Sequence, residues 1–445
     1  MILLKNFFLN ILNKKVNNLN KFSISSLYII FIILIISIST AFYLQFILLY
    51  PDIIDLRGNI IYKNIPFEYG SVIENLISKD KYFAEIGIMG NSIEFYLSRM
   101  PVLPYLFLLA KLFSSNLYFF IVSKNVIFGS IIFFTILNFS KEKSFNCLSF
   151  LIIILIFFYN PFNLKIITNF VYADFITSIL IPVLFIICLS NFKLKDYYIG
   201  LIIFILYLSK TSMFFICIFI SIYFLLFESK KIPFYFLLMA IILWGTFGFI
   251  KTNKFPFGPS MLSTNSHALS ISFNENFHKF YPLISVDYIP HCNIRGNLNK
   301  YNCNKIPKKI ENEWDYYNFY KIKNSQYIKE NLDIFLKDLI LKIKTIFFNF
   351  YEDGQIYSGD NQPKKKFLIS IFINKVILII AVIVLIRSFF NKFQVEKNKK
   401  EILFFIIIIS SMPAYLIGWA LSRHLVYIFL VSKIYLFLKF KSKLL

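Results

Sequence analysis

The sequence is poor in charge and lacks the short motifs that mark soluble enzymes. Only 16% of its 445 residues are charged, and it has five cysteines and four histidines. It contains no glycine-rich loop able to cradle a phosphate, no histidine pair at metalloprotease spacing and no nucleophile elbow. These absences exclude the familiar soluble-enzyme sites. They predict no cofactor and leave a divalent metal as an open alternative.

Acidic residues are also scarce relative to basic ones. The counts are 24 Asp and Glu against 47 Lys and Arg, so the formal net charge is +23 at pH 7. Such a surplus can indicate nucleic acid as a partner. The lysines, however, lie mostly in short connectors and tails beside apolar runs, as the positive-inside rule predicts. We therefore expect membrane lipid, and no nucleic acid, as a partner.

Long apolar runs are what the sequence has in abundance. Hydrophobic residues make up 58% of the chain and the mean hydropathy is +0.66. Several runs reach the roughly 20 residues that span a bilayer. We predict an all-α polytopic membrane protein with about ten transmembrane helices and two extracytoplasmic loop regions that carry interfacial amphipathic helices.

Flanking charges divide the chain into four parts. Residues 1–22 form a basic amphipathic lead without a signal-peptide cleavage pattern, so we expect it to stay cytoplasmic. Residues 23–250 form an N-terminal transmembrane module, whose first outer loop covers residues 51–104. Residues 251–366 form a second, extracytoplasmic loop, and residues 367–445 form C-terminal helices that return the chain to the cytoplasm. The expected location is the inner (cytoplasmic) membrane, with both termini cytoplasmic.

Three segments of the first module depart from a simple crossing. Residues 101–113 are too short to cross and are expected to be interfacial or re-entrant. Residues 160–168 are expected to be a connector with few charges. Residues 197–227 are too long for one upright helix and are interrupted at residues 209–211. Because basic pairs flank both ends, this run predicts a hairpin with Lys210 at its outer tip.

The first outer loop holds the densest set of carboxylates near a predicted membrane surface. Asp52 and Asp55 directly follow the first apolar run, one turn apart if helical, and Glu68 comes further on. Apolar residues then recur at helical spacing: Tyr69, Val72, Ile73, Leu76 and Ile77. We expect an amphipathic helix that lies on the bilayer and holds acids at the membrane rim.

The second outer loop contains two cysteines close together in sequence, Cys292 and Cys303. A pair confined to a loop in an oxidising compartment favours a disulfide. Free thiols are one alternative. Zinc is another because His291 is adjacent, although the repeated spacing of zinc ligand pairs is absent.

A further amphipathic helix is predicted downstream in the same loop. An apolar stripe runs through residues 332–347, and the opposite face carries Lys337, Asp338, Lys342 and Lys344. So many charges exclude a membrane crossing. We expect a helix that lies in the outer interface.

The predicted topology places a set of ionisable residues at one membrane face: Asp52, Asp55, Glu68, Arg99, Asp174, Lys210, Arg423 and His424. Each could also be an ordinary cap, loop residue or interfacial anchor. Together they suit an amphiphilic substrate. A lipid-linked phosphosugar requires cations for its phosphate, an apolar groove for its tail and a carboxylate for the proton of an acceptor hydroxyl.

Several short motifs, taken in order, resemble a known family. They are Glu68-Tyr69-Gly70 running to Leu76, Arg99-Met100-Pro101-Val102-Leu103-Pro104, Tyr172-Ala173-Asp174, Leu208-Ser209-Lys210-Thr211-Ser212, residues 313–347, and Arg423 before an apolar helix. Their order is similar to that in bacterial membrane glycosyltransferases of the C-type (GT-C) fold, which include protein O-mannosyltransferases and the aminoarabinose transferase of lipid A. Each motif is short, so the resemblance rests on their order over most of the chain.

The resemblance implies a transferase that moves a sugar, with inversion, from a polyprenyl-phosphate donor to a glycan, lipid or protein acceptor at the extracytoplasmic face. It also implies a carboxylate base in the first outer loop. The adjacent Asp-Glu pair of the mannosyltransferases is absent, so the candidates are Asp55 first, Glu68 second and Asp52 third. The residues expected to bind substrate are Arg99, Asp174, Lys210, Arg423 and His424.

Two other functions fit the same composition. A transporter or flippase for lipid-linked glycans is the first, and a glycan polymerase is the second. Transporters commonly show internal repeats and broken helices at the membrane midplane. Here the two halves differ in loop length and the ionisable residues gather at one face, which favours surface chemistry over alternating access.

Overall fold

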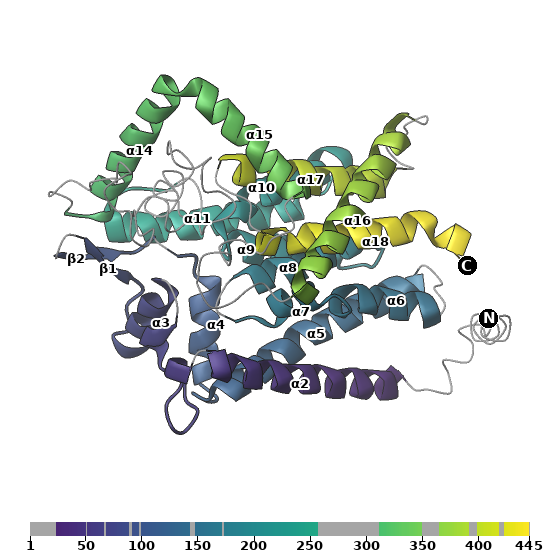
Figure 1. Ribbon diagram of the computed structural model, residues 1–445, viewed down its shortest axis with the longest axis horizontal. Coiled ribbons are helices and arrows are strands. Elements are labelled where there is room, and N and C mark those ends of the chain that lie inside the picture. Colours follow the sequence, from purple (N-terminus) through teal and green to yellow (C-terminus); the bar gives the residue numbers. More distant parts are fainter. Residues whose placement is uncertain are drawn as a thin grey trace.

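A computed structural model describes residues 24–49, 51–65, 68–88, 91–97, 99–142, 147–170, 173–256, 311–348, 365–390, 398–417 and 422–444 (Figure 1). Within these ranges the chain forms fifteen α-helices and one antiparallel hairpin, in which β1 (Ala84–Ile88) pairs with β2 (Asn91–Phe95). The expected all-helical class is confirmed in this coarse form. The hairpin was not expected.

The helices follow the apolar runs of the sequence. In the first half they are α2 (Ile24–Leu49), α3 (Glu68–Ser78), α4 (Val102–Lys111), α5 (Leu117–Glu142), α6 (Cys147–Phe158), α7 (Pro161–Thr168) and α8 (Asp174–Leu189). In the second half they are α9 (Lys195–Tyr207), α10 (Phe214–Phe227), α11 (Ile232–Thr252), α14 (Glu313–Glu330), α15 (Leu332–Phe348), α16 (Lys365–Phe390), α17 (Lys399–Ile417) and α18 (Val426–Leu444). Short 3-10 turns are η2 (Pro51–Ile53), η3 (Tyr62–Asn64), η4 (Thr211–Met213) and η7 (Ser422–Leu425).

Four helices of the described chain, α2, α5, α11 and α16, are long and apolar enough to cross a membrane. The pair α6 and α7, bent by 72° at a short break, would make a fifth. Other apolar helices are shorter. The 16 residues of α8, for example, extend about 24 Å, less than the roughly 30 Å of a hydrocarbon core. Length and composition thus fit a membrane-embedded protein, but they do not reach the expected ten crossings.

Helix α8 lies at the centre of the bundle. Its residues are buried along its length, from Asp174 to Cys188. It contacts α5, α7, α9, α17 and α18. A helix surrounded on all sides needs apolar residues on every face, and the sequence of α8 provides them. Its central position fixes the only acid in its first turn, Asp174, inside one end of the bundle.

Residues 160–168 contain helix α7 where a connector was expected, so that prediction was wrong. The side-chain oxygen of Asn160 accepts hydrogen bonds from the N–H groups of Phe162 and Asn163, each at 3.1 Å. Pro161 follows at the start of the helix. An asparagine cap followed by proline favours the start of a helix even in a short segment.

The interruption expected at residues 209–211 is present. Helix α9 ends at Tyr207, Lys210 has an extended backbone, and η4 then leads into α10. The run folds as two contacting helices with Lys210 between them. The side of the membrane on which this break lies stays a prediction.

Helix α3 packs its apolar face on protein, which corrects the expectation that it lies on the bilayer. Tyr69, Val72, Ile73 and Leu76 are buried, and α3 contacts α4, β1 and η3. In Figure 1 the helix, the hairpin and α4 gather at the left end of the molecule. The hairpin and η3 supply the apolar cover that the sequence argument had assigned to lipid.

Helix α14 is joined to the hairpin by one buried carboxylate. Glu313, which is 2% exposed, accepts hydrogen bonds from the N–H groups of Tyr96 at 2.9 Å and Leu97 at 3.0 Å. Burial, a hydrogen bond to Glu94 and the charges of Glu94 and Glu313 raise the pKa of Tyr96 to about 12. The contact connects the two predicted outer loop regions, whose bonded residues are 216 positions apart.

Helix α15 exposes apolar side chains and buries charged ones, the reverse of an amphipathic helix in a soluble protein. It meets α14 at a bend (Figure 1) and contacts α16 and α17. Leu336 and Ile340 of its apolar stripe are exposed, whereas Asp338 and Lys342 on the opposite face are buried. The Lys342 amine donates to the carbonyl of Leu416 in α17 at 2.9 Å. An outward apolar face is what the predicted interfacial position requires.

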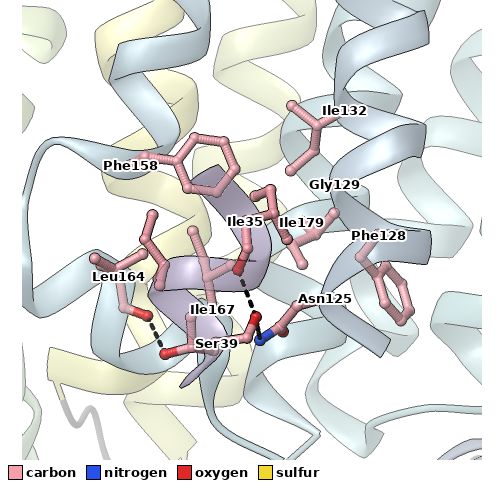
Figure 2. Close-up of a pocket in the computed structure, with 12 residues that line it drawn as sticks. Ile35, Ser39, Asn125, Phe128, Gly129, Ile132, Phe158, Leu164, Ile167 and Ile179 are labelled. Atoms are coloured by element: carbon pink, nitrogen blue, oxygen red, sulfur yellow. Dashed lines mark hydrogen bonds between the residues drawn. The ribbon is translucent and has the colours of Figure 1, made fainter. Parts of the chain in front are cut away.

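Polar groups inside the bundle also pair with one another. Figure 2 shows Ser39 donating to the carbonyl of Ile35 at 2.7 Å and accepting from the amide of Asn125 at 2.9 Å. The cavity beside them has a volume of only 10 Å³. Gly129 contributes to the close packing, because a Cβ there would lie 3.3 Å from Ile35. A space of this size holds at most about one water, so it is no substrate site.

Candidate functional site

Four of the predicted substrate-binding residues meet at one end of the bundle. Asp174 begins α8, Lys210 lies in the break before η4, and Arg423 and His424 lie in η7. Oδ1 of Asp174 forms an ion pair with Nζ of Lys210, and its Oδ2 lies 3.9 Å from Nε of Arg423. We call these four residues the Asp174 cluster. They come from three distant parts of the sequence, so only the fold brings them together.

Two buried tyrosines, Tyr415 and Tyr427, form a hydrogen-bonded chain that ends on His424 of the cluster. Nε of Arg423 donates to Nε2 of His424 at 3.4 Å. The hydroxyl of Tyr415 in α17 donates to the His424 carbonyl at 2.7 Å, and its ring stacks on the imidazole with 6.4 Å between centroids. Oη of Tyr427 lies 2.9 Å from Oη of Tyr415. Sequence reasoning missed both tyrosines, since two among the 28 in this chain give no signal.

The Asp174 cluster carries more positive than negative charge. Asp174 contributes one negative charge, and Lys210 and Arg423 contribute one positive charge each. The side chains of Asp174 and Lys210 are 6% and 18% exposed, whereas that of Arg423 is 32% exposed. Electrostatic attraction strengthens where water is excluded. The surplus charge therefore favours an anion, and Arg423 is the most accessible cation for it.

An apolar groove includes Leu208, two residues before Lys210 of the cluster. It has a volume of 390 Å³ and lies where the start of α4 meets the end of α9. There the N–H of Val102 donates to the carbonyl of Leu208 at 3.2 Å. The groove is lined by Tyr82, Pro101, Val102, Tyr105, Leu208, Leu243, Trp244 and Phe247. Because Leu208 is two residues before Lys210, the groove and the charged cluster share one short segment of chain.

Arg99 is hydrogen-bonded to one of the groove residues, Tyr82. Its guanidinium carbon lies 5.0 Å from the centre of the Tyr69 ring in α3. Its carbonyl accepts a hydrogen bond from the hydroxyl of Tyr82 at 2.7 Å, and Tyr82 is one of the groove residues. The fifth predicted substrate-binding residue thus borders the groove and packs on α3.

The predicted catalytic acids lie outside the Asp174 cluster. Asp55 is exposed in a turn, where Oδ1 accepts from the N–H groups of Arg57 at 2.8 Å and Asn59 at 2.9 Å, and Oδ2 from the Asn59 amide at 3.1 Å. The bonds from Asn59 are the main cause that lowers the pKa of Asp55. Asp52 is exposed in η2, so the two are not successive positions on one helix. Glu68 begins α3, and its side chain lies outside the described part.

The turn that holds Asp55 is hydrogen-bonded to the chain at the start of α5. The N–H of Ile60 donates to the carbonyl of Ser115 at 3.0 Å, and that of Leu117, at the start of α5, donates to Gly58 at 3.1 Å. Gly58 has φ of +76°, a conformation that favours glycine. The end of α2, just before this turn, also contacts the segment before α8, because the ring centroids of Phe46 and Phe170 lie 4.6 Å apart.

A second polar cluster, which the sequence analysis did not single out, lies at the break between α6 and α7. Oδ1 of Asn374 accepts from Nζ of Lys433 at 2.6 Å, and its amide donates to Oδ1 of Asn163 at 2.8 Å. The amide of Asn160 lies 3.3 Å from the same Asn374 oxygen. All four residues are buried. The available signal was a polar residue within an apolar run at Asn374 and at Lys433, which is costly in lipid unless it is paired.

The part of the chain that the structure describes contains no group of three or more His, Cys, Asp and Glu side chains able to hold a metal ion. Cys188 and Cys217 are buried free thiols. Cys292, Cys303 and His291 lie outside the described residues, so the disulfide and its zinc alternative stay predictions. The chain matches no protein-family model, no curated protein and no solved structure.

Proposed function

We propose that the protein is a membrane glycosyltransferase that moves a sugar from a polyprenyl-phosphate donor to an acceptor hydroxyl at the extracytoplasmic face. The observation that carries the proposal is the surplus positive charge of the Asp174 cluster, whose Lys210 follows the groove residue Leu208 by two positions. A phosphate on an apolar chain complements both features. The ten crossings, the inner-membrane location and the cytoplasmic termini belong to the same proposal.

The chemistry needs few protein groups. The acceptor oxygen attacks the anomeric carbon on the face opposite the phosphate while the bond from that carbon to the phosphate oxygen breaks. A carboxylate takes the hydroxyl proton, and polyprenyl phosphate leaves. Lys210 and Arg423 would stabilise the charge that develops on the phosphate, with Asp174 holding both cations in place. Because phosphate is a good leaving group, one base suffices and no acid is required.

The direct test uses purified protein in lipid nanodiscs with a panel of polyprenyl-phosphate sugars labelled in the sugar. We expect the label to move to an acceptor, or slowly to water, as polyprenyl phosphate accumulates. If the donor stays intact, and if it moves from one leaflet to the other in vesicles that contain the protein, the protein is a flippase and the enzyme proposal is refuted.

Arg423→Met is expected to weaken donor binding about tenfold or more while the protein stays folded. A charge-assisted contact contributes roughly 1.5–3 kcal/mol, and 1.4 kcal/mol is a factor of ten in affinity. The ion pair between Asp174 and Lys210 remains in this variant. Equilibrium titration with labelled donor measures the Kd. Arg387→Met, at an exposed arginine in the last turn of α16, is the matched control and should bind donor normally. Equal affinity in both variants would make Arg423 a plain interfacial anchor.

A flippase is the second candidate, and one observation favours it. At the 72° break between α6 and α7, Lys433 of α18 and three asparagines are buried and hydrogen-bonded to one another. Broken helices with buried polar groups are common at transporter substrate sites. The surplus charge lies in the Asp174 cluster instead, which shares the chain segment 208–210 with the apolar groove, and the transferase therefore comes first.

A further inference from the structure

The corner between α7 and α8 encloses the ammonium group of Lys124, a residue of α5. Nζ of Lys124 donates to the carbonyls of Asn169 at 2.7 Å and Thr168 at 2.9 Å, with a longer contact to Ile167 at 3.4 Å. The ring of Phe175, in the first turn of α8, lies under the same nitrogen at 4.3 Å. The ammonium therefore touches the chain on both sides of the corner.

The carbonyls of Ile167 and Thr168 are the last two of helix α7. The last carbonyls of any helix have no N–H partner within the helix, and they form the negative end of its dipole. Lys124 is 5% exposed, so water has little access to the corner. Among the described residues no carboxylate forms an ion pair with Lys124. Its positive charge is balanced by carbonyl dipoles and by the face of one ring, the groups that bind a small cation.

We propose that this corner is a monovalent-cation site that the chain fills with its own lysine ammonium. The site consists of the carbonyls of Ile167, Thr168 and Asn169 together with the Phe175 ring. The ligand class is ammonium or a small primary alkylammonium ion, because these ions donate hydrogen bonds as the lysine does. Removing the lysine should leave a vacancy that such an ion fills.

The location gives the site a structural task. Four residues lie between Asn169 and Asp174, and Phe175 directly follows Asp174. By bonding to one side of the corner and contacting the other, Lys124 fixes where α8 begins. The cation site thus positions the carboxylate of the Asp174 cluster. The inference does not depend on the proposed sugar transfer, since it concerns only the binding of a cation.

The test is rescue of Lys124→Ala by ammonium. We expect this variant to melt about 2 °C below the wild-type protein in choline chloride, since a cation at a buried helix C-terminus is among the stronger single electrostatic contacts but the melting temperature of a 445-residue chain shifts little for each contact. Ammonium or methylammonium chloride at the same ionic strength should restore at least half of that loss. Choline, which is too large for the corner, should restore none. Thermal unfolding of the purified protein in detergent measures these shifts.

Two further variants keep the test decisive. Lys433→Ala removes another buried lysine, whose ammonium also lies over a ring, that of Tyr159 at 4.8 Å, but bonds to one oxygen alone, Oδ1 of Asn374. Ammonium should not rescue this variant, because a single oxygen remains to bind the ion. Lys124→Met fills the corner without charge, and ammonium should not rescue it either. Equal melting of Lys124→Ala in ammonium and choline would overturn the proposal. A second outcome would also overturn it: Lys124→Met folds, while Lys124→Ala stays unfolded in every salt. The corner would then need the volume of a side chain and not its charge.

Discussion

Replacing Asp55 with Asn is expected to lower the turnover of sugar transfer by about 10²- to 10⁴-fold, the usual contribution of a general base. The carboxylate of Asp55 accepts three hydrogen bonds within its turn. A carboxylate has about four acceptor positions, so one is left for an acceptor hydroxyl. Asparagine keeps the oxygen that accepts from the N–H groups of Arg57 and Asn59, and the turn should persist. Single-turnover transfer and donor binding measure the two effects separately.

The other first-loop acids are tested in parallel. Glu68→Gln and Asp52→Asn address the second and third candidates for the base. Asp80→Asn is the matched control, because Asp80 is exposed after α3 and its positive φ is tolerated by asparagine. It should transfer sugar normally. Near-full turnover in all three candidate variants would rule out the transferase in this form and move the flippase ahead.

The pH dependence of transfer identifies Asp55 specifically. Hydrogen bonds from Asn59 keep the pKa of Asp55 below its ordinary 3.8. The carboxylate thus stays ionised as pH falls, and a rate that depends on it should decline only below that value. Asn59→Ala removes the side-chain bond, so the pKa of Asp55 rises and the acid limb of the profile moves to higher pH. An acid limb unchanged by Asn59→Ala would assign the base to another residue.

Asp174→Asn is expected to destabilise the protein by roughly 3–5 kcal/mol, the cost of leaving a buried charge without its partner. It leaves Lys210 and Arg423 facing each other without the carboxylate between them. Lys210→Met should cost less, because Asp174 keeps Arg423 at 3.9 Å. The double variant should be more stable than the sum of the single losses predicts. Denaturant or thermal unfolding of purified protein provides the complete double-mutant cycle.

An exposed ion pair serves as the control for this cycle. Lys79 and Glu85 lie 2.7 Å apart with side chains 51% and 45% exposed, and such pairs contribute about 0–1 kcal/mol. Lys79→Met and Glu85→Gln should therefore change stability little. If Asp174→Asn proved as stable as these controls, the Asp174 cluster would not be a buried electrostatic unit.

The sequence by itself determined where most helices lie. Apolar runs of sufficient length fold as helices whatever surrounds them, because a backbone removed from water must satisfy its own hydrogen bonds. For the same reason the polar interruption at Lys210 was readable as a break. Asn160 and Pro161 also mark the start of helix α7, because an asparagine cap followed by proline favours a helix N-terminus.

Sequence reasoning could group Asp174, Lys210, Arg423 and His424 at one membrane face, since flanking charges indicate which helix ends share a side. Only the tertiary structure decided that they touch, because distance within a face depends on the order in which helices pack, and α8 had to lie at the centre. The sequence pattern also could not show that protein covers the apolar face of α3, because an apolar stripe is equally stable against lipid or protein. Lys124 shows the same limit: an isolated lysine in an apolar run must find partners, but the fold alone chose the carbonyls at the end of α7.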